Sequence, residues 1–298
     1  MASRATIARS VQTRGIGLHT GQTVTLTLRP APPGTGVVFV RLDCQGKKIP
    51  ADQKNLSSSA YASTLSRDAV KVSTVEHLQS ALLGMGVDDL WVELDGAEVP
   101  ILDGSAAPFL KLLARAGRRE SGVDRQVMRV NKPLTVEKDG KSITVEPGRG
   151  LEIRYSIDFS HPVIGDSSKV FTLRARTYAR DIAPARTFCR LQDVEILRQA
   201  GLARGGSLAN ALVVDDRRVL NGPLRFRDEF VRHKILDLLG DLALLGMPLE
   251  GRITAVRAGH ALHGEFLRAL VSRTDVWSLV THAPVRHPRR RTVLAVPA

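Results

Sequence analysis

The sequence predicts an α+β protein made of two duplicated domains, each a sheet covered by helices, because the same order of elements occurs twice. In both halves, two strand-like segments flank a proline and a Gly-X-Gly turn, and a helix with a histidine near its start comes later. A further strand and a closing helix follow in each half, as expected for α+β layers related by an internal repeat. Apolar residues form 43% of the 298 residues, which supports two cores, and the 4% of aromatic residues makes these cores aliphatic.

The first half opens with a segment in which threonine alternates with apolar residues, and a second apolar segment follows the turn. This pairing predicts a hairpin. Apolar side chains then recur every three or four positions, which predicts a helix that begins near Ser73 and ends at a glycine. A short apolar run predicts the next strand, and a last periodic run predicts the closing helix. In chain order these elements cover residues 23–28, 37–40, 73–86, 90–94 and 109–113.

The second half repeats this order with a hairpin, a long amphipathic helix, a strand and a closing helix. These elements cover residues 142–145, 151–157, 228–245, 252–257 and 266–270. The charged segment 115–125 lacks apolar periodicity and is expected to join the two halves. We therefore predict an N-terminal domain over residues 1–124 and a C-terminal domain over residues 125–298.

The net charge of +13 requires an anionic partner or tolerance of one. Nucleic acid is the first candidate, but the basic clusters at residues 115–129 and 286–291 carry no interleaved aromatic residues for base stacking. A phosphate-bearing substrate or an anionic membrane surface explains the charge equally well. No apolar run approaches the roughly 20 residues of a membrane span, and no signal core is present, so a cytoplasmic protein is expected. Cys44 and Cys189 are too few for a disulfide framework or a cysteine-rich zinc site.

His233 and Asp237 are four residues apart on the helix expected at 228–245, so their side chains share one face. They lie almost opposite the apolar stripe, and Asp241 follows one turn later. Such a pair is more often a solvated face that contributes a few tenths of a kcal/mol. The sequence alone therefore leaves two interpretations open, an exposed pair or part of a metal site.

His77 follows Glu76 at the start of the first-half helix. Ser73 and Glu76 have the spacing of a capping box, which explains this motif without explaining His77. Two histidines and one aspartate from two helices would make the three-ligand, one-water site of catalytic zinc, with a neighbouring glutamate as general base. If the two copies pack through equivalent helices, His77 and His233 become neighbours.

His260 lies in a Gly-His segment expected to form a loop before the last helix. A loop histidine is usually a surface residue, but this one corresponds in position to the loop 103–105 of the first half, which makes it a candidate acid or oxyanion partner. Asp241 is suited to keep that imidazole protonated. Segments 185–189 and 201–207 flank a helical stretch at 192–200 and suit a sugar or acyl substrate, although ordinary turns explain them as well.

Taken together, these motifs resemble the UDP-3-O-acyl-N-acetylglucosamine deacetylases, zinc amidases of lipid A biosynthesis. The likeness spans nearly the whole chain, and the long motifs occur in the family's order. They cover residues 15–21, 73–78, 101–109, 185–188, 205–207, 228–237 and 259–262.

The resemblance implies that His77, His233 and Asp237 bind one Zn²⁺, with Fe²⁺ as a possible native ion. It implies that Glu76 is the general base and that His260, kept cationic by Asp241, stabilises the oxyanion and protonates the leaving amine. Thr187 and Lys234 would support the same oxyanion. It further implies that Phe188 contacts the glucosamine ring and that Lys141 and Arg257 lie near the UDP diphosphate. The residues with implied roles are Glu76, His77, Lys141, Thr187, Phe188, His233, Lys234, Asp237, Asp241, Arg257 and His260.

The family fold consists of two α+β layers that pack through their helices, each with a small insert, and the second insert forms an apolar passage for the acyl chain. The partner implied is the UDP-linked acylated glucosamine, with transient contact with the inner membrane surface, no nucleic acid and a monomer. Three features depart from the family pattern: Cys189 replaces an expected Gly, His263 replaces an expected Asn, and the tail at 286–291 is arginine-rich. Two other functions stay open, a zinc amidohydrolase of another acylated amine and a basic nucleic-acid-binding protein with a structural metal.

Overall fold

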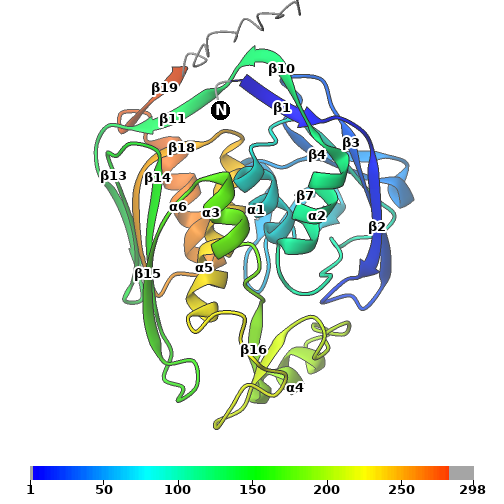
Figure 1. Ribbon diagram of the computed structural model, residues 1–298, viewed down its shortest axis with the longest axis vertical. Coiled ribbons are helices and arrows are strands. Elements are labelled where there is room, and N and C mark those ends of the chain that lie inside the picture. Colours follow the sequence, from blue (N-terminus) through cyan, green and yellow to red (C-terminus); the bar gives the residue numbers. More distant parts are fainter. Residues whose placement is uncertain (1–2, 282–298) are drawn as a thin grey trace, which may run out of the picture.

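The computed structural model describes residues 3–281, and the arginine-rich segment 286–291 lies outside that range. Figure 1 shows two sheets on opposite sides of a group of helices, with α1, α3 and α5 between them. This arrangement confirms the predicted α+β class. The helices are α1 (Glu76–Met85), α2 (Ala107–Ala116), α3 (Ala175–Asp181), α4 (Leu191–Gln199), α5 (Glu229–Leu242) and α6 (His260–Ser272).

The sheet of the first half has the order β2-β3-β9-β4-β5, and that of the second half has the order β12-β13-β18-β11-β19, with β14 beside β18 and β15 beside β14. Alternation along β3 is as expected from its sequence, because its apolar side chains are buried and its threonines are more exposed. The first sheet contains β2 (Val11–Ile16), β3 (Thr23–Pro30), β4 (Val37–Arg41), β5 (Lys47–Pro50) and β9 (Leu90–Leu94). The second contains β11 (Gln126–Val130), β12 (Leu134–Lys138), β13 (Lys141–Glu146), β14 (Leu151–Asp158), β15 (Asp166–Thr172), β18 (Leu249–Val256) and β19 (Trp277–Thr281).

The two predicted hairpins are wrong. Strand β9 lies between β3 and β4, antiparallel to the first and parallel to the second, and β18 lies between β13 and β14 in the same way. A helix returning across a sheet brings the next strand in parallel to an earlier one, and α1 and α5 precede β9 and β18. Apolar alternation identifies a strand but not its neighbour. Both sheets share this order, as a repeat requires, and the duplication itself stays a prediction.

The segment expected to be a plain joint is mostly a strand. β10 (Arg118–Asp124) pairs antiparallel with β1 (Ser3–Ile7), and backbone hydrogen bonds hold it although most of its side chains are exposed. The predicted domain boundary after residue 124 falls between β10 and β11 and stays a prediction. Each half also carries a small additional sheet. The first has β6 (Leu56–Ser58), β7 (Thr64–Arg67) and β8 (Val70–Val72), and the second pairs β16 (Phe188–Arg190) with β17 (Leu212–Val214).

The helices α1 and α5 pack against each other at the centre of the core and are buried on nearly every side. Of the two interpretations left open for the polar face of α5, the exposed pair is excluded, because His233 and Asp237 are each 2% exposed. Helices with apolar surroundings on all sides rarely carry ionisable residues, which are costly to bury unless they are paired or bind a metal. The polar residues of these two helices thus mark the candidate site.

The close approach of α1 and α5 depends on Gly240. A Cβ atom at this position would lie 2.1 Å from the carbonyl oxygen of Glu76, which is a backbone atom and cannot move without shifting α1. Glycine is otherwise unfavourable in a helix interior by about 1 kcal/mol relative to alanine. Its presence here therefore reflects the distance between the helices rather than helix formation.

Within residues 3–281, the structure contains no helix with the length and apolar character of a membrane span.

We predict that Gly240→Ala lowers the free energy of unfolding by about 1–3 kcal/mol, because the added methyl group pushes α1 from α5. Chemical denaturation measures this change. Gly264→Ala is the matched control in α6, where a Cβ meets the ends of the Leu56 and Arg268 side chains. The control should be neutral or slightly stabilising, and equal stability of both variants would contradict the argument.

Candidate metal centre and active site

His77, His233 and Asp237 form a buried cluster between α1 and α5, with one ligand atom of each within 4.8 Å of the others. Asp237 Oδ1 lies 3.2 Å from His233 Nε2 and 3.8 Å from His77 Nε2. The two imidazole rings meet edge to face with centroids 5.0 Å apart. The structure thus brings together the three residues that the sequence proposed as metal ligands.

The protonation states of these three side chains suit the binding of a cation. Burial lowers the pKa of His77 to about 3 and also lowers the pKa of His233, so both imidazoles are neutral near pH 7. His233 Nδ1 lies 3.1 Å from the carbonyl oxygen of Ala185, which fixes the proton on Nδ1 and leaves a lone pair on Nε2. Asp237 Oδ1 is buried and has no hydrogen-bond donor among the described residues. Lone pairs that face one another in this way can be satisfied by a positive ion between them.

Lys234 pairs with the other oxygen of the same carboxylate, because its Nζ donates to Asp237 Oδ2 at 2.9 Å. Its ammonium group also lies 5.6 Å from the centroid of the Phe188 ring. This contact leaves Oδ1 free to face the histidines. Lys234 therefore places positive charge directly beside the candidate metal site.

Glu76 is the first residue of α1, and its carboxylate points into the core rather than into a capping box. The N-cap residue is Val75, without a side-chain cap, so the capping-box interpretation is wrong. The backbone at Thr74 has φ +57°, which turns the chain just before the helix begins. Glu76 Oε2 accepts a hydrogen bond from Ser63 N at 3.1 Å. Burial raises the pKa of Glu76 to about 7, which suits a general base.

His260 faces Glu76 from the opposite side of the cluster. Its Nε2 lies 3.9 Å from Glu76 Oε1, and its Nδ1 lies 2.6 Å from Asp241 Oδ2. Burial alone would lower the pKa of His260, but the facing carboxylates, chiefly Asp241, raise it to about 10. His260 is thus an imidazolium at neutral pH. The loop expected around it is wrong, because His260 begins α6 after the extended Gly259.

Thr187 and Phe188 lie where the second half meets the first. Thr187 N donates to the carbonyl of Gly104 at 2.8 Å, in the loop between β9 and α2 of the first half. The Phe188 ring packs edge to face on Phe159 and Phe230, with centroids 5.8 and 4.8 Å away. Both residues line a cavity together with Lys234, so they connect this cavity to the metal cluster.

This cavity has a volume of about 880 Å³ and extends along β16, α4 and β17. Most of its lining is apolar, and Cys189 and His19 also face it. Burial raises the pKa of the Cys189 thiol, which keeps it protonated and unreactive. The apolar residues of the lining include Leu191, Val194, Ile196, Leu197, Leu208, Val213 and Leu220.

Lys141 and Arg257 lie together at neighbouring ends of β13 and β18, apart from the cavity lining. Arg257 Nη2 donates to the carbonyl of Gly140 at 2.6 Å, and Nη1 lies 3.5 Å from Asp158 Oδ2. The structure brings this pair together, and no hydrogen bond or ion pair among residues 3–281 joins it to the metal cluster.

The glycines at 205 and 206 approach the protein's own backbone. A Cβ on Gly205 would lie 2.2 Å from the carbonyl oxygen of Gly17, and Gly205 N donates to the carbonyl of Leu18 at 3.0 Å. Segment 205–206 therefore packs against the N-terminal loop at residues 17–18.

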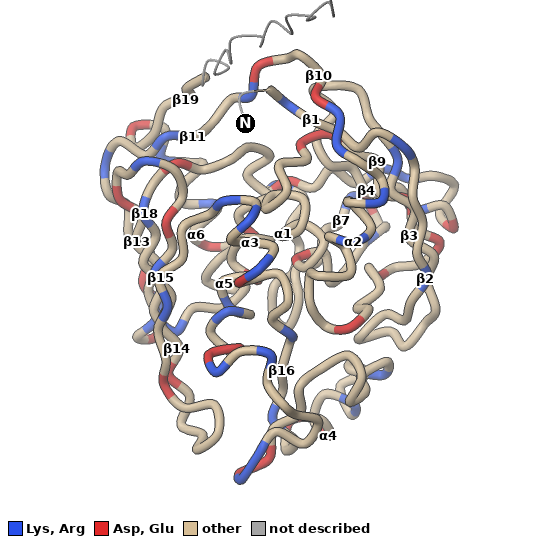
Figure 2. The backbone as a smooth tube through the Cα atoms, in the orientation of Figure 1, with Lys and Arg blue, Asp and Glu red and all other residues tan. Residues whose placement is uncertain are grey.

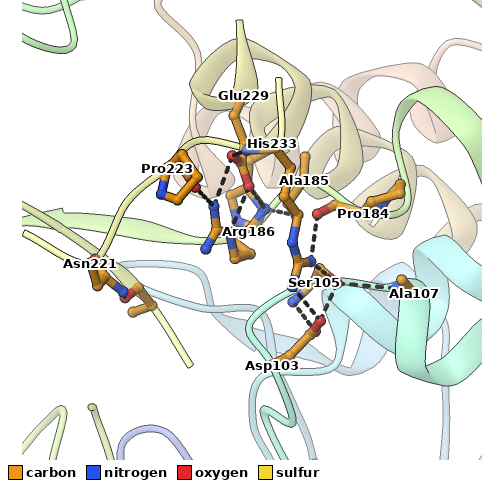
Figure 3. A network of polar contacts seen from close by, with 12 residues as sticks. Asp103, Ser105, Ala107, Pro184, Ala185, Arg186, Asn221, Pro223, Glu229 and His233 are labelled. Carbon is orange, nitrogen blue, oxygen red and sulfur yellow. Dashed lines mark hydrogen bonds and ion pairs between the residues drawn. The ribbon is translucent and has the colours of Figure 1, made fainter. Parts of the chain in front are cut away.

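A buried ion pair holds the backbone behind the metal cluster. Figure 3 shows Arg186 and Glu229 beside Ala185, whose carbonyl meets His233. Arg186 donates through its backbone N and its Nε to Glu229 Oε1 at 3.0 and 2.9 Å. Arg225 N donates to the other oxygen at 2.6 Å, and the Arg225 side chain reaches Asp103 of the first half at 3.0 Å. This network fixes the segment that carries Ala185 and Thr187.

Sequence reasoning missed Ser63, Tyr155 and the Arg186–Glu229 pair. The hydroxyl of Ser63 donates to Asp241 Oδ1, and Tyr155 OH lies 3.2 Å from His263 Nε2. Ser63 stands in an irregular segment with no pattern to mark it. Tyr155 stands at an inward position of a strand, where alternation predicts burial but says nothing about its hydroxyl group.

We predict that Arg186→Met destabilises the protein by about 3–5 kcal/mol, because the fully buried Glu229 would keep its backbone hydrogen bonds but lose its charged partner. Chemical denaturation measures the loss, and metal affinity should fall roughly 10-fold or more because the Ala185 carbonyl shifts. Adding Glu229→Gln removes the stranded charge and should recover much of the stability. A double variant as unstable as the single one would contradict this account.

Comparison with known proteins agrees with this geometry. The model of the UDP-3-O-acyl N-acetylglycosamine deacetylase (LpxC) family matches residues 4–272. The UDP-3-O-acyl-N-acetylglucosamine deacetylase of Myxococcus xanthus is 49% identical over 280 residues, which cover 93% of this chain and 89% of the relative. Proteins with the same name in Chromohalobacter salexigens and Acidithiobacillus ferrooxidans are 44% and 46% identical, over 94% and 97% of this chain and 94% and 96% of those relatives. The chain therefore belongs to the UDP-3-O-acyl N-acetylglycosamine deacetylase family.

Proposed function

We propose that this chain hydrolyses the N-acetyl group of a UDP-linked 3-O-acyl-N-acetylglucosamine and releases acetate, a committed step of lipid A biosynthesis. The observation that carries the proposal is the buried set of two neutral imidazoles and one ionised carboxylate beside a glutamate and an imidazolium. The names of the relatives supply the substrate class. Membership of the family and this donor set together make the chain a metal-dependent hydrolase.

One metal ion held by His77, His233 and Asp237 would supply Lewis-acid activation of water and of the amide carbonyl. Glu76, kept near neutral pKa by burial, accepts a proton from the attacking water. His260 carries the proton that the leaving amine needs, and Asp241 keeps it in place. Thr187 and Lys234 line the cavity beside the cluster and are assigned to the developing oxyanion.

Two nitrogens and one carboxylate oxygen are the donor set of many catalytic zinc sites, so the proposed ion is Zn²⁺. Fe²⁺ accepts the same donors and is the second candidate for the native ion. Metal analysis of protein purified without added metal distinguishes them.

The cavity beside β16, α4 and β17 is assigned to the fatty acyl chain, because most of the side chains that line it are apolar. Phe188 stands where this cavity meets the cluster and is assigned to the glucosamine ring. Lys141 and Arg257 are assigned to the diphosphate on the family resemblance and on their charge, because both are exposed where β13 begins and β18 ends.

We further propose that the enzyme is cytoplasmic and contacts the inner membrane surface transiently. One chain supplies every residue assigned to the chemistry, which supports a monomer as the active unit. Figure 2 shows the Lys and Arg residues dispersed over both sheets and the α4 region rather than gathered in one stripe, which favours an enzyme over a nucleic-acid-binding protein.

We expect acetate release from the UDP-linked, 3-O-acylated substrate to stop on chelation and to return when Zn²⁺ is added. An analogue without the acyl chain should react at least about 10-fold more slowly, which excludes a general amidohydrolase. Glu76→Gln should lose about 100-fold or more in kcat while it binds one metal and folds normally. Acetate release that chelation does not affect would overturn the proposal.

The alkaline limb of the pH profile should depend on Asp241. His260 acts as an acid, so activity falls as pH rises through its pKa, which Asp241 helps to raise to about 10. Asp241→Asn removes that charge and should move the limb down by roughly 1–3 pH units. Ser63→Ala removes a hydrogen bond to the same carboxylate without removing its charge, and should shift the limb less. An alkaline limb that is identical in wild type and Asp241→Asn would exclude this role.

A further inference from the structure

Tyr155, His263, Asp241 and His260 form one continuous hydrogen-bonded chain inside the second half. His263 and Tyr155 are both fully buried. Asp241 Oδ2 lies 2.7 Å from His263 Nδ1 and 2.6 Å from His260 Nδ1, so one oxygen receives two imidazoles. The hydroxyl of Ser63 donates to the other oxygen.

The protons in this chain can be assigned. Burial lowers the pKa of His263, so its ring is neutral, and the ionised Asp241 accepts the Nδ1 proton. His263 Nε2 is then an acceptor, and Tyr155 OH lies 3.2 Å from it. The single proton of this hydroxyl also faces the carbonyl oxygen of Ala258 at 2.8 Å and is shared between the two acceptors. Tyr155 thus contacts both His263 and the backbone that leads into His260.

The fold explains why these contacts constrain Asp241. His260 and His263 are one turn apart on α6, so both reach the same oxygen of a carboxylate on α5. A carboxylate turns easily about its terminal torsion, and a single hydrogen bond would leave it several orientations. Three donors, two from α6 and one from Ser63, permit one. The same Asp241 oxygen binds the His260 ring, whose other nitrogen, Nε2, lies 3.9 Å from Glu76 Oε1.

We propose that His263, held by Tyr155, is a positioning residue that fixes the Asp241 carboxylate against His260. The proposal rests on the deacetylase function proposed above. It assigns His263 no contact with substrate or metal. Its effect passes through Asp241 to the proton that His260 delivers, and therefore concerns turnover rather than substrate binding.

The group Asp241, His260 and His263 also has the composition of a metal site. Its geometry favours hydrogen bonds instead, because both Nδ1 atoms lie at hydrogen-bond distance from one shared oxygen. A metal ion there would displace the two Nδ1 protons. The proposal therefore predicts a metal content of one ion per chain, unchanged by substitution of His263.

Two variants of His263 separate positioning from simple packing. His263→Leu keeps an apolar side chain of related size and removes the donor. His263→Asn places an amide N–H two bonds from Cβ, where the ring Nδ1 stands, and restores a donor to Asp241. We expect His263→Leu to lower kcat roughly 10–100-fold with little change in KM, and His263→Asn to recover most of that loss.

Tyr155→Phe tests the link from strand β14. Tyr155→Phe should lower kcat when His263 is present. It should lower kcat less in the His263→Asn chain, because the asparagine side chain makes no hydrogen bond with the tyrosine hydroxyl. NMR gives a second readout: the wild type should show two protected, downfield imidazole N–H signals, and His263→Asn should lose one.

Thermal unfolding and metal analysis of each variant accompany the kinetics. A His263→Leu enzyme with wild-type kcat would overturn the proposal, as would a folded, metal-loaded His263→Asn enzyme as slow as His263→Leu. If the proposed deacetylase function itself is wrong, the wild-type chain will release no acetate. This result differs from both outcomes above.

Discussion

The structure depends on the contact between α1 and α5. Gly240 lets the start of α1 come against the middle of α5, and no side chain other than hydrogen fits between Gly240 and the Glu76 carbonyl. Two ionisable groups of α1, Glu76 and His77, are thereby brought beside those of α5 inside the core. Each depends on the others for neutralisation, because an isolated charge at this depth would cost several kcal/mol.

Burial and charge act in opposite directions on the members of this cluster. Burial makes His77 and His233 neutral and raises the pKa of Glu76, while Asp241 overcomes burial at His260. The same depth in the protein therefore gives a pair of candidate ligands, a candidate base and a candidate acid. Environments that separate the pKa values of neighbouring groups are typical of active sites.

The sequence predicted the α+β class and marked His233 and Asp237 as candidate ligands, because helix periodicity and i, i+4 spacing are local properties. His233 and Asp237 looked exposed since they oppose an apolar stripe, and only the packing of a second helix on that face reverses this. The sequence could not predict which strands lie beside β3 and β13, because strand order is set by distant segments. Ser63 and Tyr155 carry no local signal, and their importance arises from contacts with Asp241 and His263, which lie far along the chain.

The origin of the ligands in separate halves links metal supply to the lifetime of the protein. The binding atoms assemble only when α1 and α5 are docked, so an ion bound there favours the native chain over the unfolded one by mass action. Free metal at 1,000 times the dissociation constant would add about 4 kcal/mol of stability. A cell short of metal would thus lose enzyme molecules to proteolysis as well as their turnover.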